Sequence, residues 1–167
     1  MTGKKLQRQG GGEELFTLEV GIISGPITED FARKNKVISR TIQIRGGQTL
    51  EDLHEAIFQA FDRFDEHLYE FQIGGKRPMD PSARRFSLPM VMKSPFGDEE
   101  ETADATRTAI GSIGLKRKEI FCYWFDFGDD WWHQIEVVSI DETIPKGRFP
   151  KVIKKIGKSP PQYPDWD

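Results

Sequence analysis

The chain has 167 residues, of which 37% are hydrophobic and 31% charged, a composition typical of a soluble globular domain. Its net charge of −3 gives no overall electrostatic case for nucleic-acid binding. No window approaches the roughly 18 apolar residues of a membrane span, and MTGKKLQRQGGG lacks the apolar region of a secretory signal. The single cysteine, Cys122, excludes an internal disulfide framework and a multi-cysteine zinc site. We therefore expect a cytoplasmic protein without a membrane partner.

The first part of the chain predicts two strands after a polar tail. Residues 1–12 are polar and glycine-rich, which predicts a flexible tail. Apolar side chains alternate from Phe16 to Ile22 and again from Ile38 to Ile44, as in half-buried strands. The connection over residues 27–35 is longer than a tight hairpin loop, so the two strands need not be joined by a simple turn.

The clearest helix is predicted over about residues 49–62. Thr49 is a good N-cap, and Asp52 stands three residues later, in a near match to the capping box. Acidic residues in the first turns suit the helix dipole. The apolar stripe follows at helical spacing and consists of Leu50, Leu53, His54, Ile57, Phe58 and Phe61.

Shorter elements are predicted between residues 67 and 114. Alternation from His67 to Ile73 predicts a third strand. Residues 86–92 predict a short edge strand, because the proline at position 89 cannot donate to a ladder. Residues 94–103 are acidic and predict a mobile loop, and apolar spacing over residues 105–113 predicts a short second helix.

The segment FCYWFDFGDDWWHQIEVVSI predicts an aromatic β-hairpin within residues 119–140. A three-residue loop over residues 128–130 sets Phe127 opposite Trp131, whereas a two-residue loop would set it against Asp130. With the longer loop one face carries Phe121, Tyr123, Phe125, Phe127, Trp131, His133, Ile135 and Val137. The other face carries Cys122, Trp124, Asp126, Trp132, Gln134 and Glu136.

The order of elements predicts a single α+β domain over residues 13–167. We expect a mixed, mostly antiparallel sheet with the main helix on one face. The strand–strand–helix–strand start is compatible with a β-grasp-like core on element order alone. Residues 145–167 contain five prolines and are expected to form an extended C-terminal strap.

The three histidines and the acidic hairpin turn are the candidate chemical groups. His54 lies on the apolar helix stripe, which favours a core role with a hydrogen-bond partner. His67 opens a strand, and His133 lies close in sequence to Asp126 and Asp129. A histidine among carboxylates can act as a general base or bind a hard divalent ion. Aspartates in turns also satisfy their own backbone amides, and we favour this structural role.

Other sequence signals indicate binding rather than catalysis. No phosphate-binding loop, nucleophile elbow or HExxH motif is present. Trp124 and Trp132 are predicted neighbours that would stack on a base, a sugar or a peptide proline, or pack beneath the strap. Six basic and no acidic residues lie from Lys146 to Lys158, typical of a solvated face or a phosphate-binding surface. The sequence specifies no cofactor and no metal ligand set.

Three blocks of the sequence resemble one known family. They are TLEDLHEAIFQAFDRFDEHLYEFQI, FCYWFDFGDDWWHQIEV and RFPKVIKKIGKSPPQ. They resemble, in turn, the Leu-His helix with its His-Leu-x-x-Phe, the Tyr-x-Tyr-Asp-Phe-Gly-Asp-x-Trp-x-His signature, and the Pro-Pro-Glu-Asp end of the plasmid pRiA ORF-three-like family. That family is also labelled a transposon-passenger TnpR-like domain. The resemblance runs from about Val37 to Pro161.

This resemblance implies a compact α+β domain of uncharacterised function, associated with mobile elements. The chain departs from the pattern where Trp124 replaces the second tyrosine and Phe64 a tryptophan. Gln162-Tyr163 also replaces the usual acidic pair, so a role of that pair does not carry over. By position, the signature residues are His54, His67, Asp126, Gly128, Asp129, Trp131 and His133.

We expect a non-enzymatic binding or interaction module with a protein or nucleic-acid partner. One alternative is a metal-dependent, hydrolase-like enzyme, which requires His67, Asp126, Asp129 and His133 to converge. The other is a nucleic-acid-binding domain, which requires the C-terminal basic segment, Arg84-Arg85 and residues 116–118 to merge on one face. The candidate binding residues are His54, His67, Trp124, Asp126, Gly128, Asp129, Trp131, Trp132 and His133.

Overall fold

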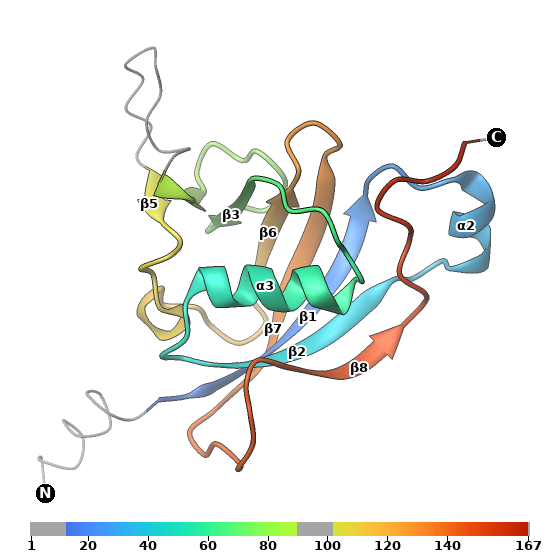
Figure 1. Ribbon diagram of the computed structural model, residues 1–167. Coiled ribbons are helices and arrows are strands. Elements are labelled where there is room, and N and C mark those ends of the chain that lie inside the picture. Colours follow the sequence, from blue (N-terminus) through green and yellow to red (C-terminus); the bar gives the residue numbers. More distant parts are fainter. Residues whose placement is uncertain (1–12, 90–101, 167) are drawn as a thin grey trace, which may run out of the picture.

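The computed structural model describes residues 13–89 and 102–166, which form one eight-stranded sheet and two helices. The strands lie in the order β5-β4-β3-β6-β7-β1-β2-β8, and α3 crosses one face of the sheet (Figure 1). The elements are β1 (Leu15–Ser24), α2 (Glu29–Lys34), β2 (Ser39–Arg45), α3 (Leu50–Ala60), β3 (Tyr69–Ile73), β4 (Arg84–Ser87), β5 (Thr102–Asp104), the 3₁₀ helix η1 (Ile110–Ser112), β6 (Ile120–Phe125), β7 (Trp131–Asp141) and β8 (Lys151–Ile156).

Within the described residues every strand pair is antiparallel except β4 and β5, which are parallel. This confirms the predicted α+β class with a mixed, mostly antiparallel sheet. The β3 strand pairs with β4 and β6, so β6 and β7 stand between β3 and β1. The likeness of the first elements to a β-grasp core stays a prediction from element order.

The main helix begins where the sequence predicts. The Thr49 hydroxyl accepts the Asp52 N–H at 3.1 Å, and the Asp52 carboxylate accepts the Thr49 N–H at 2.9 Å. This reciprocal capping box satisfies two backbone donors at the helix start. The helix ends at Ala60, two residues before the predicted end, and Asp62 then takes a left-handed conformation with φ of 55°. Its sheet-facing residues are Leu50, Leu53, His54, Ile57 and Ala60, all buried.

The aromatic hairpin forms, but its turn is longer than predicted. Phe125 pairs with Trp131 and Tyr123 with His133, two residues away from the expected register. Asp126 leaves the ladder because its N–H donates to the Leu68 carbonyl and its own carbonyl accepts the N–H of Asp130. A two-residue shift keeps each strand residue on its expected face. The aromatic face is therefore buried as predicted, except that Phe127 lies in the turn and packs on Trp124.

Three short elements differ from the predictions. The predicted helix over residues 105–113 is wrong, because only the three-residue η1 forms there and the Asp104 carboxylate turns the chain by accepting the Thr106 N–H. The α2 helix was missed because it buries no residue and so has no apolar stripe. The strand predicted over residues 86–92 is β4, which begins two residues earlier and ends at Ser87.

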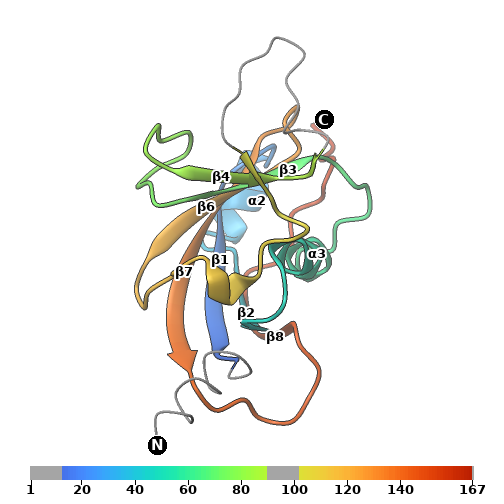
Figure 2. The same cartoon turned by 90° about the vertical axis from the view of Figure 1, so that its left-hand side faces the viewer.

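The C-terminal segment contains the edge strand β8 and then crosses the α3 side of the sheet (Figures 1 and 2). Arg40 on β2 binds this segment by donating to the carbonyls of Ile156 and Gly157, at 3.0 and 3.1 Å, and to the Ser159 hydroxyl at 2.9 Å. It also donates to the Ala60 carbonyl at 3.0 Å. One buried arginine thus joins β2, the end of α3 and the C-terminal segment.

The flexible tail expected at residues 1–12, and residues 94–101 of the expected mobile loop, lie outside the described residues. The last two residues of that predicted loop, 102 and 103, belong instead to β5. No helix of the described chain is long and apolar enough to cross a membrane.

Candidate functional site

The three histidines are distant in sequence but meet around one aromatic cluster on the α3 side of the sheet. His54 comes from α3, His67 precedes β3, and His133 lies on β7. The rings of His54 and His67 each lie 5.9 Å from the ring of Phe125. The His133 ring lies 4.9 Å from that of Tyr123.

Buried His54 is the centre of a chain of hydrogen bonds that runs from the exposed Glu66 side chain to buried Tyr123. Its Nε2 lies 2.6 Å from Glu66 Oε1, and its Nδ1 lies 2.5 Å from the Tyr123 hydroxyl. The hydrogen bond from His54 lowers the pKa of Glu66, so this carboxylate is ionised at neutral pH and accepts the Nε2 proton. With the ring proton assigned to Nε2, Nδ1 accepts a hydrogen bond from the Tyr123 hydroxyl. Tyr69 stacks on the His54 ring at 3.8 Å with an interplanar angle of 6°.

Arg63 lies beside this chain as a buried cation. It follows α3, is 7% exposed, and has no carboxylate within salt-bridge distance among the described residues. Its guanidinium carbon lies 4.4 Å from the centre of the Trp131 ring, 4.9 Å from Phe125 and 5.8 Å from Phe61. Such cation–π contacts offset part of the desolvation cost. Burial lowers the pKa of Arg63 to about 10, so it remains charged at neutral pH.

His133 accepts a hydrogen bond from Arg63. Its Nε2 lies 3.3 Å from Arg63 Nη2, and its Nδ1 lies 3.2 Å from the Tyr123 carbonyl. A guanidinium only donates, so Nε2 is the acceptor and the ring proton is assigned to Nδ1. Burial, with a smaller contribution from the Arg63 charge, lowers the pKa of His133 well below its usual value. Both ring nitrogens are therefore committed within the core.

Three buried polar atoms in this region have no hydrogen-bond partner within the described residues. They are Arg63 Nε, Trp131 Nε1 and the Tyr69 hydroxyl. The Trp131 ring is fully buried, and a Cβ added at Gly25 would collide with it, so only glycine fits there. Of these three groups, the Arg63 guanidinium and the Trp131 indole stack on each other.

His67 lies nearer the surface, where the C-terminal segment meets the loop after α3. Its Nε2 lies 2.7 Å from the Tyr163 hydroxyl, 3.4 Å from Asp126 Oδ2 and 3.5 Å from Asp65 Oδ2. Tyr163 donates to the same Asp65 carboxylate at 2.5 Å, which raises the pKa of Tyr163 to about 12. The hydrogen bonds among His67, Tyr163 and Asp65 hold the C-terminal segment against the loop after α3.

The acidic hairpin turn is organised by Asp126. Its Oδ1 accepts the backbone N–H groups of Gly128 and Asp129, at 3.0 and 3.2 Å. Asp129 itself is exposed. These bonds give Asp126 and Gly128 the turn-forming role that aspartate-rich loops often have.

The proposed metal-binding set does not converge. His67 and Asp126 meet, but His133 is committed to Arg63 and Tyr123, and Asp129 is an exposed turn residue. Among the described residues no group of three or more histidine, cysteine or acidic side chains has the geometry of a metal site.

Trp124 and Trp132 lie on the opposite face of the sheet from α3. Their rings stack at 4.9 Å with an interplanar angle of 8°, and both are half-buried. Trp124 also packs on Phe127 at 4.2 Å and donates its Nε1 proton to Asp130 at 2.9 Å. The C-terminal segment crosses the other face, and β1 and β2 separate β8 from β7. The pair is therefore neither beneath the strap nor rimmed by its basic residues.

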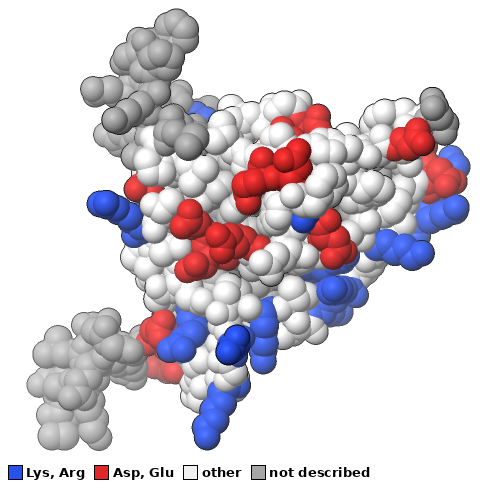
Figure 3. Space-filling view, viewed as in Figure 1, with Lys and Arg blue, Asp and Glu red and all other residues white. Residues whose placement is uncertain are grey.

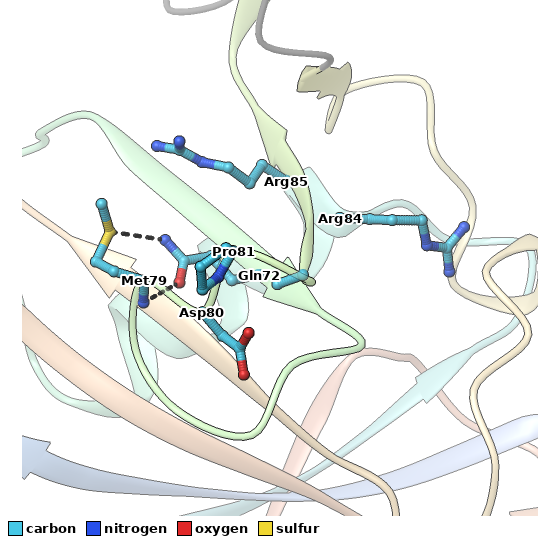
Figure 4. Close-up of a pocket in the computed structure, with 7 residues that line it drawn as sticks. Gln72, Met79, Asp80, Pro81, Arg84 and Arg85 are labelled. Carbon is cyan, nitrogen blue, oxygen red and sulfur yellow. Dashed lines mark hydrogen bonds between the residues drawn. The ribbon is translucent and has the colours of Figure 1, made fainter.

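A pocket of about 500 Å³ opens on the same face as the tryptophans, between the β3–β4 ladder and the loop over residues 74–83 (Figure 4). Gln72 Oε1 accepts the Met79 N–H at 2.8 Å. The Asp80 carboxylate accepts the N–H groups of Lys76 and Ser82, which lower its pKa to about 2. Behind the pocket, buried Glu70 is paired with Arg85. The polar groups of this pocket thus satisfy one another.

The sequence did not identify three residues of this region as candidate site residues, namely Arg63, Glu66 and Tyr69. Arg63 and Glu66 stand in the polar stretch after the helix, which is typical of an exposed turn. The position of Arg63 between two phenylalanines was the only local sign that it would be drawn into the core. Tyr69 was predicted as a strand residue, but its stacking on His54 depends on tertiary packing.

Comparison with known proteins supports the family resemblance and the fold. The family model described as plasmid pRiA4b ORF-3-like protein matches residues 30–163. The chain is also similar to the crystal structure of a protein of unknown function, MM3350, from Methanosarcina mazei Go1. The two are 22% identical with a TM-score of 0.63, over 86% of this chain and 69% of the other. At this identity the likeness concerns the fold alone. No curated protein matches the chain.

Proposed function

The chain belongs to the plasmid pRiA4b ORF-3-like family, and from that premise we propose that it is a non-enzymatic binding module. Its contact surface is the sheet face opposite α3, centred on Trp124 and Trp132. We include an association with mobile elements in the proposal because the family description names a plasmid. The proposal also keeps the expected cytoplasmic location, where the single thiol of Cys122 stays reduced.

The stacked tryptophan pair is the observation that carries this proposal. Two indoles are held parallel at 4.9 Å yet stay half-buried. The α3 helix covers the other face of the sheet (Figure 2). Covering such rings with a partner removes apolar surface from water, and tryptophan is enriched at the energetic centres of interfaces. Within the described chain, the aromatic contact of Trp132 is with Trp124 alone, so no second ring covers it.

The surroundings of the pair favour a neutral or cationic protein segment. Asp130 is bonded to Trp124, and exposed Asp129 adjoins it in the same turn. Across the strands, the register neighbours of the pair are Glu70 and Ser24, neither of them basic. A proline ring or an arginine guanidinium would stack on an indole in such a setting. We therefore propose an extended peptide that contains proline or arginine as the partner.

The two alternative functions have weaker support. A metal-dependent enzyme would need the four side chains that do not converge. A nucleic-acid surface would need a continuous basic track, but β4 and β8 are second and last in the sheet. At roughly 4.8 Å per strand they lie about 29 Å apart. On the α3 side, Figure 3 shows basic side chains along the β8 edge and acidic ones over α3, which interrupts such a track further.

Peptide selection with two matched variants tests the proposal. Peptides selected from a random displayed library on the wild-type protein should be enriched in proline and arginine. Their affinity, measured by calorimetric titration, should fall at least about tenfold in Trp132→Ala, equivalent to about 1.4 kcal/mol. Phe64→Ala, which removes a 73% exposed ring from the α3 side, should leave the affinity unchanged.

Two results would overturn the proposal. One is unchanged affinity in a folded Trp132→Ala protein, with its far-UV circular dichroism preserved. The other is outright unfolding of this variant, which would show that the tryptophan pair belongs to the core.

A further inference from the structure

We propose that Arg63 and Trp131 form a buried binding site for a small carboxylate, between the end of α3 and the start of β7. The site lies on the opposite face of the sheet from Trp124 and Trp132. It therefore stands independently of the peptide-binding proposal.

The first argument is the chemistry of the unpaired atoms. Arg63 Nε and Trp131 Nε1 are both buried and have no acceptor within the described chain. The guanidinium carbon lies 4.4 Å from the centre of the indole, so the two N–H groups belong to neighbouring planes. Both atoms can only donate, and leaving a buried donor unsatisfied is energetically unfavourable. The missing partner must therefore be an acceptor.

The second argument is charge. The hydrogen bond from Arg63 goes to His133, which is neutral, and its other close contacts are aromatic rings. The Asp126 carboxylate favours the charged form of Arg63 from a distance, but no salt bridge joins the two among the described residues. Asp126 is engaged instead by the amides of its own turn and by His67. A buried cation is stable when an anion pairs with it, and a single guanidinium matches a single negative charge. The ligand is therefore a monoanion.

The third argument is size. Gly25 packs on the Trp131 ring without room for even one added carbon, so the ring has no space to move on that side. Arg63 is only 7% exposed, so the ligand must be small. A carboxylate offers two oxygens on a small planar group, one for each N–H. Phosphate and sulfate carry more charge than one arginine balances, so formate and acetate are the best probes.

The test follows the indole N–H signals by ¹⁵N NMR during titration with sodium formate or acetate, at constant ionic strength maintained with sodium chloride. The Trp131 signal is expected to shift and saturate, together with Arg63 Nε–H. Trp166, whose side chain is 65% exposed, supplies an internal control that should not saturate. The melting temperature should rise with formate, as for any ligand that binds only the folded state.

Two variants separate this site from a general salt effect. Arg63→Lys keeps the positive charge but removes Nε–H, and saturation should be lost. Trp131→Phe keeps a packed ring but removes Nε1–H, and formate should bind at least about tenfold more weakly, as followed through Arg63 Nε–H. If either variant fails to fold, the wild-type titration still decides, because it carries its own control in Trp166.

Three outcomes would overturn the proposal. A Trp131 signal that moves linearly, like that of Trp166, would show that no site exists. Equal saturation by chloride and formate, in a titration balanced with a larger anion, would assign a halide site instead. A Trp131 proton that exchanges slowly but responds to no anion would mean that an ordered water satisfies these donors.

Discussion

At the scale of single residues, Arg63 determines the state of its neighbours. It brings a positive charge into a cluster of aromatic rings, and its Nη2 donates to His133. Because a guanidinium has no lone pair to offer, it fixes both the tautomer and the charge of the histidine. His133 then donates from Nδ1 to the Tyr123 carbonyl across the hairpin. The signature residues Trp131 and His133 thus both contact this arginine.

The state of His133 predicts a specific loss of stability in mild acid. Its pKa is lowered in the folded protein, so the unfolded chain binds an extra proton below about pH 6.5. The contribution of neutral His133 to the free energy of unfolding is fully present above about pH 6.5 and is lost as the pH falls below this value. The free energy of unfolding should therefore decline from pH 7.5 to 5, by up to about 1.4 kcal/mol per pH unit.

Urea unfolding of wild type and His133→Gln at several pH values checks this prediction. Glutamine keeps an acceptor for Arg63 but does not titrate. The variant should be less stable than wild type at pH 7.5, and its free energy of unfolding should decline less steeply as the pH falls to 5. Glu66, whose pKa is also lowered, contributes only nearer pH 4.5, outside this window. Parallel declines in the two proteins would rule out His133 as the origin.

The sequence predicts the faces of the hairpin but not its pairing. Alternation is enough to place Phe121, Tyr123 and Phe125 in the core, because any register shifted by an even number of residues keeps them there. The turn length depends on how Asp126 bonds to Leu68 and to its own turn, which alternation does not encode. The burial of Arg63 escapes prediction for a similar reason, since the rings that enclose it come from distant segments.

At the scale of elements, the C-terminal segment is held by a few buried side chains rather than by a broad apolar face. Gln162 is 3% exposed, and its Oε1 accepts the N–H groups of Phe64 and Asp65 at 3.0 and 3.1 Å. Its Nε2 donates to the Asp65 carbonyl at 2.7 Å. An amide satisfies both requirements, whereas a carboxylate could only accept. Glutamine therefore suits this position for a physical reason.

Substitution of Gln162 should loosen the segment measurably. Gln162→Ala removes three hydrogen bonds made by a buried side chain, so the protein should lose about 1–3 kcal/mol of unfolding free energy. Gln162→Glu should recover part of this loss, because it restores the acceptor but not the donor. Tyr163→Phe, at an exposed neighbouring position, should change stability less than Gln162→Ala. Denaturant unfolding of the three variants tests the order, and a Tyr163→Phe loss larger than that of Gln162→Ala would contradict it.

The helices and strands differ in how clearly the local sequence predicts them. The α3 helix combines a capping box with an apolar stripe, so two independent signals agree on it. The β8 strand, KVIKKI, shows no alternation, because it is an edge strand with most of its side chains exposed. The position of β8 depends on its pairing with β2 and on the hydrogen bonds from Arg40. Both involve residues distant in sequence, so the local sequence of β8 does not predict them.

At the scale of the whole molecule, the sheet must avoid pairing with other chains at its open edge. The β8 edge is six residues long and carries exposed Ile153 and Ile156, which would favour association. It also carries Lys151, Lys154 and Lys155, and a bulge interrupts its pairing with β2. Lysines and bulges are the usual protection of natural edge strands. We therefore assign the basic character of β8, visible along the edge in Figure 3, to solubility.

This assignment predicts that the edge lysines prevent self-association. The double variant Lys154→Thr/Lys155→Thr should associate as its concentration rises, with little change in unfolding free energy, because both side chains are exposed. The control Lys146→Thr/Lys158→Thr removes the same two charges, from −3 to −5, just outside the strand. Sedimentation velocity over a range of concentrations should show association in the first variant and wild-type behaviour in the second. Association of both to the same degree would show that net charge, rather than protection of the β8 edge, keeps the molecules apart.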